Sequence, residues 1–190
     1  MFMFVTGVMG TGKSAQLLDF VEGYAVTYQE VTVFTAEPGE GTCAEVSSRD
    51  GRVQPARRVF PHSKLLVDPE RTEPLCVIID EAQFLTPDQV LQLVKAENTG
   101  LYNIYAFGLT LAFDGTVFPG AAALNAWAQR KWTLTHPHVS CNVRRCSEAP
   151  VLNGRVSEGK LLREGPQIMV GGDDVYVPLC RTHWLRGDFE

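Results

Sequence analysis

The stretch that most limits the fold of this chain is "GVMGTGKS", at residues 7–14. It matches the pattern G-x-x-x-x-G-K-[ST] at Gly7, Gly12, Lys13 and Ser14. A strand-like apolar run at residues 2–6 precedes it, and apolar residues at helical spacing follow it. In that setting, backbone N–H groups and a helix N-terminus point at a bound phosphate. The stretch therefore predicts a nucleotide-binding loop rather than a glycine-rich turn without a ligand.

The phosphate loop and a second acidic motif together predict a site for ATP and Mg²⁺. The loop residues expected to contact ATP are Gly7, Val8, Met9, Gly10, Thr11, Gly12, Lys13 and Ser14. We expect Lys13 to reach the β- and γ-phosphates, and the Ser14 hydroxyl to ligate Mg²⁺. The motif "VIIDEAQF" places Asp80 at the end of a buried strand, where it would hold the Mg²⁺ through water.

Glu81, next to Asp80, is the candidate catalytic base. It could take a proton from water, which gives an NTPase, or from a substrate hydroxyl, which gives a kinase. The alternative is an acidic pair at the end of a strand, solvated at the surface. The phosphate loop in the same chain favours the catalytic interpretation.

Strands that alternate with helices predict an α/β fold in which helices cover both faces of a parallel sheet. The expected strands are 2–6, 31–35, 75–80, 103–109 and 131–135. The expected helices are 14–26, 87–97 and 120–129. Thr86 and Pro87 read as the N-cap and first residue of the second helix. Residues 36–64 show little periodicity and predict a long loop or a mobile segment.

The character of the chain changes after about residue 138, where Cys, Gly, Pro and short β-like runs become frequent. We therefore expect a nucleotide-binding domain over 1–138 and a small β-rich lobe over 139–190. Two pairs of closely spaced metal-ligand residues in this lobe predict a structural zinc site. The pairs are Cys141 with Cys146, and Cys180 with His183. His136 or His138 could replace one ligand, and the alternative is a set of buried cysteines without metal. Such a site would hold together a lobe that is short for independent folding.

Composition limits the partners of the chain. It has 190 residues and a formal net charge of -5, and its basic residues are scattered. A nucleic-acid-binding face is therefore not expected. No apolar run approaches the roughly 20 residues needed to cross a bilayer. The start "MFMFVTGVMG" lacks a basic n-region and a cleavage site. We expect a cytoplasmic protein without membrane contact.

Taken in order, these residues resemble the type II thymidine kinases, the zinc-containing class of cellular and bacterial origin. "DEAQFLTPDQV" is similar to the acidic motif of that family. "FGLTLAFDGTVFPGAAAL", at 107–124, is similar to its substrate-covering lasso. "VGGDDVYVPLCRTHW" is similar to its final segment. The resemblance covers nearly the whole chain and implies phosphorylation of thymidine or deoxyuridine at the 5′-hydroxyl by ATP.

The resemblance also implies roles for individual residues. Glu81 would remove the proton from the nucleoside hydroxyl. The positions that would enclose the base are Met9, Phe84, Leu109, Phe113, Phe118 and Met169, with Tyr176 closing over the ring. The base would be held largely by backbone groups of the lasso and final segment. The family further implies a homotetramer that is inhibited by the end-product triphosphate.

The chain departs from the family pattern at three places. "AEPGEGT" at 36–42 lacks the Arg that many members carry after the second strand, and the lasso has "TLA" where bacterial relatives often carry Arg and Asp. The spacing between Cys141 and Cys146 is also longer than usual. Arg49 or another residue would then have to supply positive charge. The missing Arg keeps open the alternative of a relative that binds nucleotide with weakened transfer. A P-loop ATPase in which Glu81 activates water to drive a partner is the other alternative.

Overall fold

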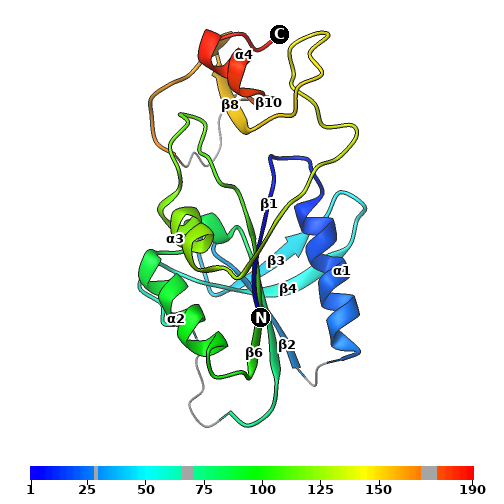
Figure 1. The fold of residues 1–190 in the computed structure, drawn as a ribbon, viewed down its shortest axis with the longest axis vertical. Coiled ribbons are helices and arrows are strands. Elements are labelled where there is room, and N and C mark those ends of the chain that lie inside the picture. Colours follow the sequence, from blue (N-terminus) through cyan, green and yellow to red (C-terminus); the bar gives the residue numbers. More distant parts are fainter. Residues whose placement is uncertain (28–29, 66–70, 168–174) are drawn as a thin grey trace.

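A seven-stranded sheet with helices on both faces forms the larger part of the molecule (Figure 1). The computed structural model describes residues 1–27, 30–65, 71–167 and 175–190. The sheet has the order β3-β4-β2-β5-β6-β1-β7, and all neighbours are parallel except β3 and β4. Its strands are β1 Phe2–Thr6, β2 Glu30–Thr35, β3 Cys43–Ser47, β4 Val53–Arg58, β5 Leu75–Asp80, β6 Tyr102–Gly108 and β7 Arg130–Thr133. The α/β prediction is confirmed.

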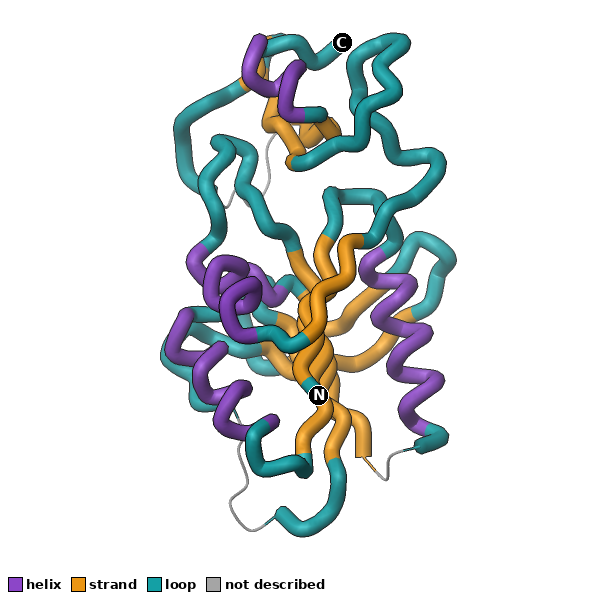
Figure 2. The backbone as a smooth tube through the Cα atoms, in the orientation of Figure 1, coloured by secondary structure: helices purple, strands orange, loops and turns teal. Residues whose placement is uncertain are grey.

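Helix α1 covers one face of the sheet, and helices α2 and α3 cover the other (Figure 2). Their bounds are α1 Lys13–Ala25, α2 Pro87–Glu97 and α3 Pro119–Trp127. Each face has its own apolar core. All six residues of β5 are buried, which explains its unbroken apolar sequence.

The start of α2 follows the predicted capping pattern. The Thr86 hydroxyl accepts a hydrogen bond from the Gln89 N–H at 3.2 Å, and the Gln89 side chain accepts one from the Thr86 N–H at 3.0 Å. Pro87 occupies the first turn, where a backbone N–H would have no helical partner. The short 3₁₀ turn η1, Ala82–Phe84, joins this helix to β5.

The prediction of a loop or mobile segment over residues 36–64 is wrong. The segment contains the antiparallel hairpin of β3 and β4, which extends the sheet beyond β2. Each of these strands buries a single residue, Val46 or Ala56, so the apolar alternation is too weak to predict a strand. Pro55 is accommodated because β2 pairs only with Arg57 and Arg58 of β4.

The small lobe carries a three-stranded antiparallel sheet in the order β10-β8-β9. Its elements are β8 Leu152–Ser157, β9 Lys160–Leu161, β10 Val175–Leu179 and helix α4 Arg181–Arg186. The lobe lies beyond the carboxyl ends of β1 and β6, on the side of the phosphate loop (Figure 1). None of the helices in the described parts of the chain has the length and apolar character needed to cross a bilayer.

Candidate active site

The phosphate loop follows β1 and ends in α1. Gly10 and Gly12 both have φ of +85°, a left-handed conformation that glycine adopts without strain. At residue 7 the reason for glycine is steric. A Cβ there would lie 2.6 Å from Thr11 Oγ1 and 2.8 Å from Leu134 O. Gly12 precedes α1 and no side chain caps the helix. The N–H groups of the first helical turn are therefore available to an anion.

Lys13 bends back over the loop. Its Nζ donates hydrogen bonds to Gly7 O at 2.8 Å and to Val8 O at 3.1 Å. Burial lowers the pKa of Lys13, while the negative charges of Glu81 and Asp80 act in the opposite direction. A phosphate chain in this loop would give the ammonium group a stronger partner than the two carbonyls.

Asp80 ends β5 and is buried. Burial raises the pKa of Asp80 to about 7, with a further contribution from the charge of Glu81, and Lys13 opposes the shift. A buried carboxylate of this kind gains stability from a nearby cation. Carboxylate and hydroxyl oxygens are ligands that Mg²⁺ prefers, and the assignment of Asp80 and Ser14 to Mg²⁺ stays a prediction.

Glu81 has φ of +50°, a left-handed conformation that is uncommon outside glycine. Gln83 Nε2 donates a hydrogen bond to Glu81 Oε2, and Gln83 Oε1 accepts one from Leu109 N at 3.0 Å. Through these two bonds, the Gln83 amide links the Glu81 carboxylate to the start of the lasso. The Gln83 side chain is almost fully buried. Sequence reasoning missed this residue, although it stands two positions after Glu81 in the quoted motif.

A cavity of about 380 Å³ lies beside Glu81. Six of the seven residues predicted to enclose a base line it: Met9, Phe84, Leu109, Phe113, Phe118 and Tyr176. The seventh, Met169, lies outside the described residues. The rings of Phe84 and Phe118 meet edge to face, with centroids 5.5 Å apart. The cavity therefore combines apolar and aromatic walls with the carboxylates of Glu37 and Glu81, a lining that suits a small planar ligand with polar groups.

Several polar residues of this cavity were not predicted: Glu37, Gln83, Asn153 and Gln167. Asn153 is buried in β8, and its Oδ1 accepts a hydrogen bond from Met9 N at 3.0 Å. This bond joins the small lobe to the phosphate loop. The sequence gives no sign of it, because the two residues are 144 positions apart.

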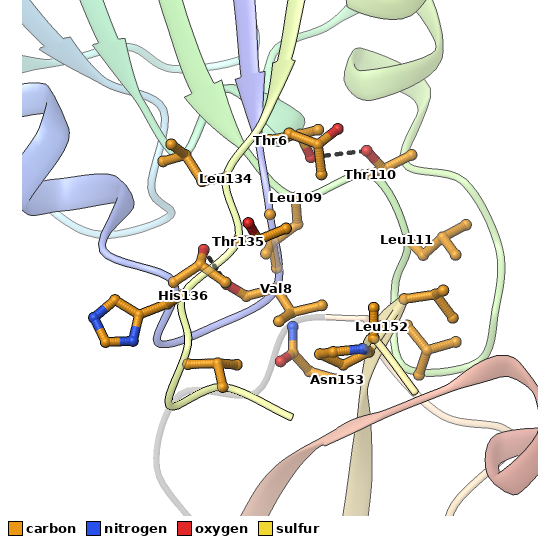
Figure 3. Close-up of a pocket in the computed structure, with 17 residues that line it drawn as sticks. Thr6, Val8, Leu109, Thr110, Leu111, Leu134, Thr135, His136, Leu152 and Asn153 are labelled. Atoms are coloured by element: carbon orange, nitrogen blue, oxygen red, sulfur yellow. Dashed lines mark hydrogen bonds between the residues drawn. The ribbon is translucent and has the colours of Figure 1, made fainter. Parts of the chain in front are cut away.

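A second cavity of about 290 Å³ is lined by Val8 and Asn153, among others (Figure 3), and it shares Asn153 with the first cavity. Its labelled lining includes Thr6 and Thr110, whose hydroxyl oxygens are 2.8 Å apart, and Leu152 of the small lobe. Its walls come from the phosphate loop, the lasso, the segment after β7 and the small lobe. The cavity thus marks the junction between the two lobes.

Arg49 lies close to the phosphate loop, at the turn between β3 and β4. A Cβ on Gly10 would lie 3.7 Å from both Nη1 and Nη2 of Arg49. Arg52 holds this turn against α1, because its Nη1 donates to Asp19 Oδ1 at 2.8 Å and its Nη2 donates to Ala15 O at 3.3 Å. The hairpin that sequence reasoning missed therefore brings a guanidinium group to the nucleotide loop.

The predicted zinc ligands come together in the small lobe. The ligand atoms of Cys141, Cys146, Cys180 and His183 all lie within 4.8 Å of one another. His183 Nδ1 lies 3.4 Å from Cys141 Sγ and 3.3 Å from Cys180 Sγ, distances compatible with a tetrahedral zinc ion. His136 and His138 are exposed and are not members of this group. Four protein ligands would make the site structural.

The comparisons with known proteins agree with this geometry. A family model described as thymidine kinase matches residues 1–184. A thymidine kinase of Legionella pneumophila is 32% identical, and the match covers 98% of this chain and 90% of the relative. Thymidine kinases of Shouchella clausii and Rhizobium meliloti are 34% and 35% identical, with 94% and 95% of this chain covered, and 92% and 94% of the relatives.

The first prediction concerns the metal. We expect purified protein to contain about one zinc ion per chain, and Cys180→Ser to lose it and lower the melting temperature of the small lobe. Elemental analysis and thermal unfolding measure both. Cys43→Ser is the matched control, because Cys43 is exposed in β3 and lies outside the group. Zinc-free protein, or equal behaviour of the two variants, would contradict a structural zinc site.

The second prediction uses the raised pKa of Asp80. Its carboxyl binds its proton more tightly in the native state than in the unfolded state, so native stability falls as pH rises from about 4 to about 7. We expect Asp80→Asn to be more stable than wild type at pH 8 without magnesium and nucleotide, and the difference to shrink toward pH 4. Urea unfolding at several pH values measures this.

Asp188→Asn, which changes an exposed carboxylate near the C-terminus, is the control for Asp80→Asn. A stability difference for Asp80→Asn that is the same at pH 4 and pH 8 would show that burial of the charge is not its cause.

Proposed function

We propose that this chain, which belongs to the thymidine kinase family, transfers the γ-phosphoryl group of ATP to the 5′-hydroxyl of thymidine or deoxyuridine. The observation that carries the proposal is the position of Glu81. Its carboxylate borders both the aromatic cavity and the buried region around Lys13 and Asp80. A nucleoside in the cavity and a triphosphate on the loop would therefore meet at Glu81.

The proposed reaction divides among residues of the chain in a simple way. The phosphate loop and Lys13 bind the triphosphate, and Ser14 and Asp80 hold Mg²⁺, which neutralises charge on the phosphates when it is bound. Glu81 accepts the proton of the 5′-hydroxyl as the oxygen attacks the γ-phosphorus, and ADP leaves. Gln83 keeps the Glu81 carboxylate in place through its bond to the lasso.

The aromatic cavity favours a nucleoside over water as the acceptor. Met9, Phe84, Phe113, Phe118 and Tyr176 offer a planar base its stacking and apolar contacts. A P-loop ATPase would need only room for a water molecule beside Glu81. A lasso that covers the base also excludes water, which would otherwise hydrolyse ATP.

Arg49 is proposed as the source of the positive charge that residues 36–42 lack. Its guanidinium group lies beside Gly10, and among the described residues no acidic side chain is hydrogen-bonded to it. A planar guanidinium group can donate two parallel hydrogen bonds to phosphate oxygens. This placement argues against the alternative of a relative with weakened transfer.

Assembly into a homotetramer and inhibition by the end-product triphosphate belong to the same proposal. The edge strand β7, with all four residues exposed, is one surface available for assembly. Light scattering during gel filtration measures the size of the assembly.

The third prediction is the outcome of a substrate panel with and without Glu81→Gln. We expect monophosphate to form from thymidine or deoxyuridine in step with ADP, and Glu81→Gln to bind ATP normally but turn over about 10²–10⁴-fold more slowly. Both products are quantified with each deoxynucleoside and Mg·ATP. Glu40→Gln, an exposed carboxylate after β2, is the control.

Each result of the panel separates the candidate functions. ADP without monophosphate would identify an ATPase, and binding without either product would identify a relative without efficient transfer. Near-normal turnover of Glu81→Gln would remove Glu81 from the role of base.

The fourth prediction concerns Arg49. We expect Arg49→Ala to lower kcat by about 10²-fold, the usual cost of losing one donor to developing charge, and Arg49→Lys to recover part of the loss. The KM for the nucleoside should change little, because Arg49 lies beside the phosphate loop. Arg57→Ala, an exposed arginine of β4, is the control. An unchanged kcat for Arg49→Ala would assign the charge to another residue.

A further inference from the structure

The tip of the lasso, residues 112–116, depends on the small lobe for its position. The tip closes on itself through hydrogen bonds from Gly115 N to Ala112 O at 3.1 Å and from Ala112 N to Thr116 O at 2.9 Å. These short bonds fix the turn but do not fix where the turn lies. The side chain of Phe113 in this tip lines the aromatic cavity, so the position of the tip decides the shape of that wall.

Trp184 of α4 contacts the tip in two ways. Its Nε1 donates a hydrogen bond to Phe113 O at 3.0 Å. Its ring lies against Gly115, where a Cβ would come within 2.5 Å of Cη2 and 2.8 Å of Cζ2. The indole therefore holds the tip through one directed bond and one close packing contact, and only glycine fits at residue 115.

Neighbouring side chains hold the indole and the Phe113 ring in place. The Arg163 guanidinium group lies over the Trp184 ring, 4.1 Å from its centroid, and Arg163 Nη2 donates a hydrogen bond to Trp184 O. The guanidinium group of Arg155, a buried residue of β8, lies 5.2 Å from the centroid of the Phe113 ring. The wall of the cavity is thus supported by residues of the small lobe.

Trp184 is also connected to the candidate metal site. It follows His183 directly, its N–H donates to Cys180 O at 3.0 Å, and its side chain packs in the apolar cluster around Cys141, Leu179 and Cys180. A helix of six residues has little stability of its own. Ligands at Cys180 and His183 would fix both the start and the middle of α4.

We propose that Trp184 is a positioning residue that transmits the order of the Cys/His group to the lasso tip, and so sets the affinity of the aromatic cavity for its ligand. Only the identity of the ligand, a nucleoside, rests on the proposed function. It assigns to the small lobe a role in substrate affinity as well as in stability.

The fifth prediction tests the contact with Trp184→Phe, which keeps an aromatic ring but removes the N–H donor. We expect the KM for thymidine to rise about three- to tenfold, as for the loss of one neutral hydrogen bond, with an unchanged KM for ATP and unchanged zinc content. Trp127→Phe, at an exposed position on α3, is the matched control. A thymidine KM within twofold of wild type would overturn the proposal.

A double-mutant cycle with Gly115→Ala separates the contact from general damage to the fold. The backbone strain of alanine at φ +82° is the same in both backgrounds and cancels. The clash with the indole does not cancel, because the phenyl ring of Trp184→Phe is smaller. We expect Gly115→Ala to raise the thymidine KM less in the Trp184→Phe background than in wild type. Additive effects would show that the two residues do not act through one contact.

Hydrogen exchange tests the contact without any ligand. We expect the amides of residues 112–116 to exchange faster in Trp184→Phe than in wild type or Trp127→Phe. This result is expected even if the protein phosphorylates no nucleoside, so a failure of the proposed function is distinguishable from a failure of this inference. Unchanged exchange would overturn the role of Trp184 in holding the tip.

Tryptophan fluorescence tests whether the metal site influences Trp184 and the lasso tip. The chain has three tryptophans, so a protein with Trp127→Phe and Trp132→Phe reports Trp184 alone. We expect zinc removal by a chelator to shift its emission and to speed exchange at the lasso tip, and the chelator to change tip exchange much less in Trp184→Phe. Release of zinc without either change would overturn the transmission from the metal site.

Discussion

The burial of charge at the carboxyl edge of the parallel sheet is the constraint on which the site depends. Lys13 begins helix α1 and Asp80 ends strand β5, and both lie in surroundings that disfavour their charged forms. Each is partly stabilised by the other, and neither is fully satisfied by the protein alone. In the proposed function, a triphosphate with its divalent cation would supply the missing charges. Binding of these ligands would then stabilise this region of the fold.

The small lobe contacts both the phosphate loop and the lasso, the two segments that follow strands of the large sheet at the site. It reaches the phosphate loop through Asn153 and Met9, and the lasso through Trp184 and Phe113. Both of these bonds go to backbone groups, so the lobe controls where the main chain lies while other side chains form the cavity. This division explains how a lobe with a small apolar core can influence a site whose chemistry resides elsewhere.

Local sequence was sufficient to predict the parts of the molecule in which short-range rules determine structure. The phosphate loop, the fully buried β5 and the capped helix α2 each carry their signal within a few residues. The hairpin of β3 and β4 does not, because each strand buries one side chain and takes its stability from pairing in the sheet. Asn153 and Trp184 could not be assigned from local sequence, because their partners Met9 and Phe113 are 144 and 71 positions away in the chain.

The left-handed backbone of Glu81 lowers the stability of the fold, whereas its side chain supplies the proposed catalytic base. A residue with a Cβ is strained in this conformation, whereas glycine is not. Selection for thermal stability alone would therefore favour glycine at this position, and that single exchange would remove the carboxylate. With Glu81 as the proposed base, a library of variants screened only for folding would lose the glutamate early, and one screened for turnover would retain it.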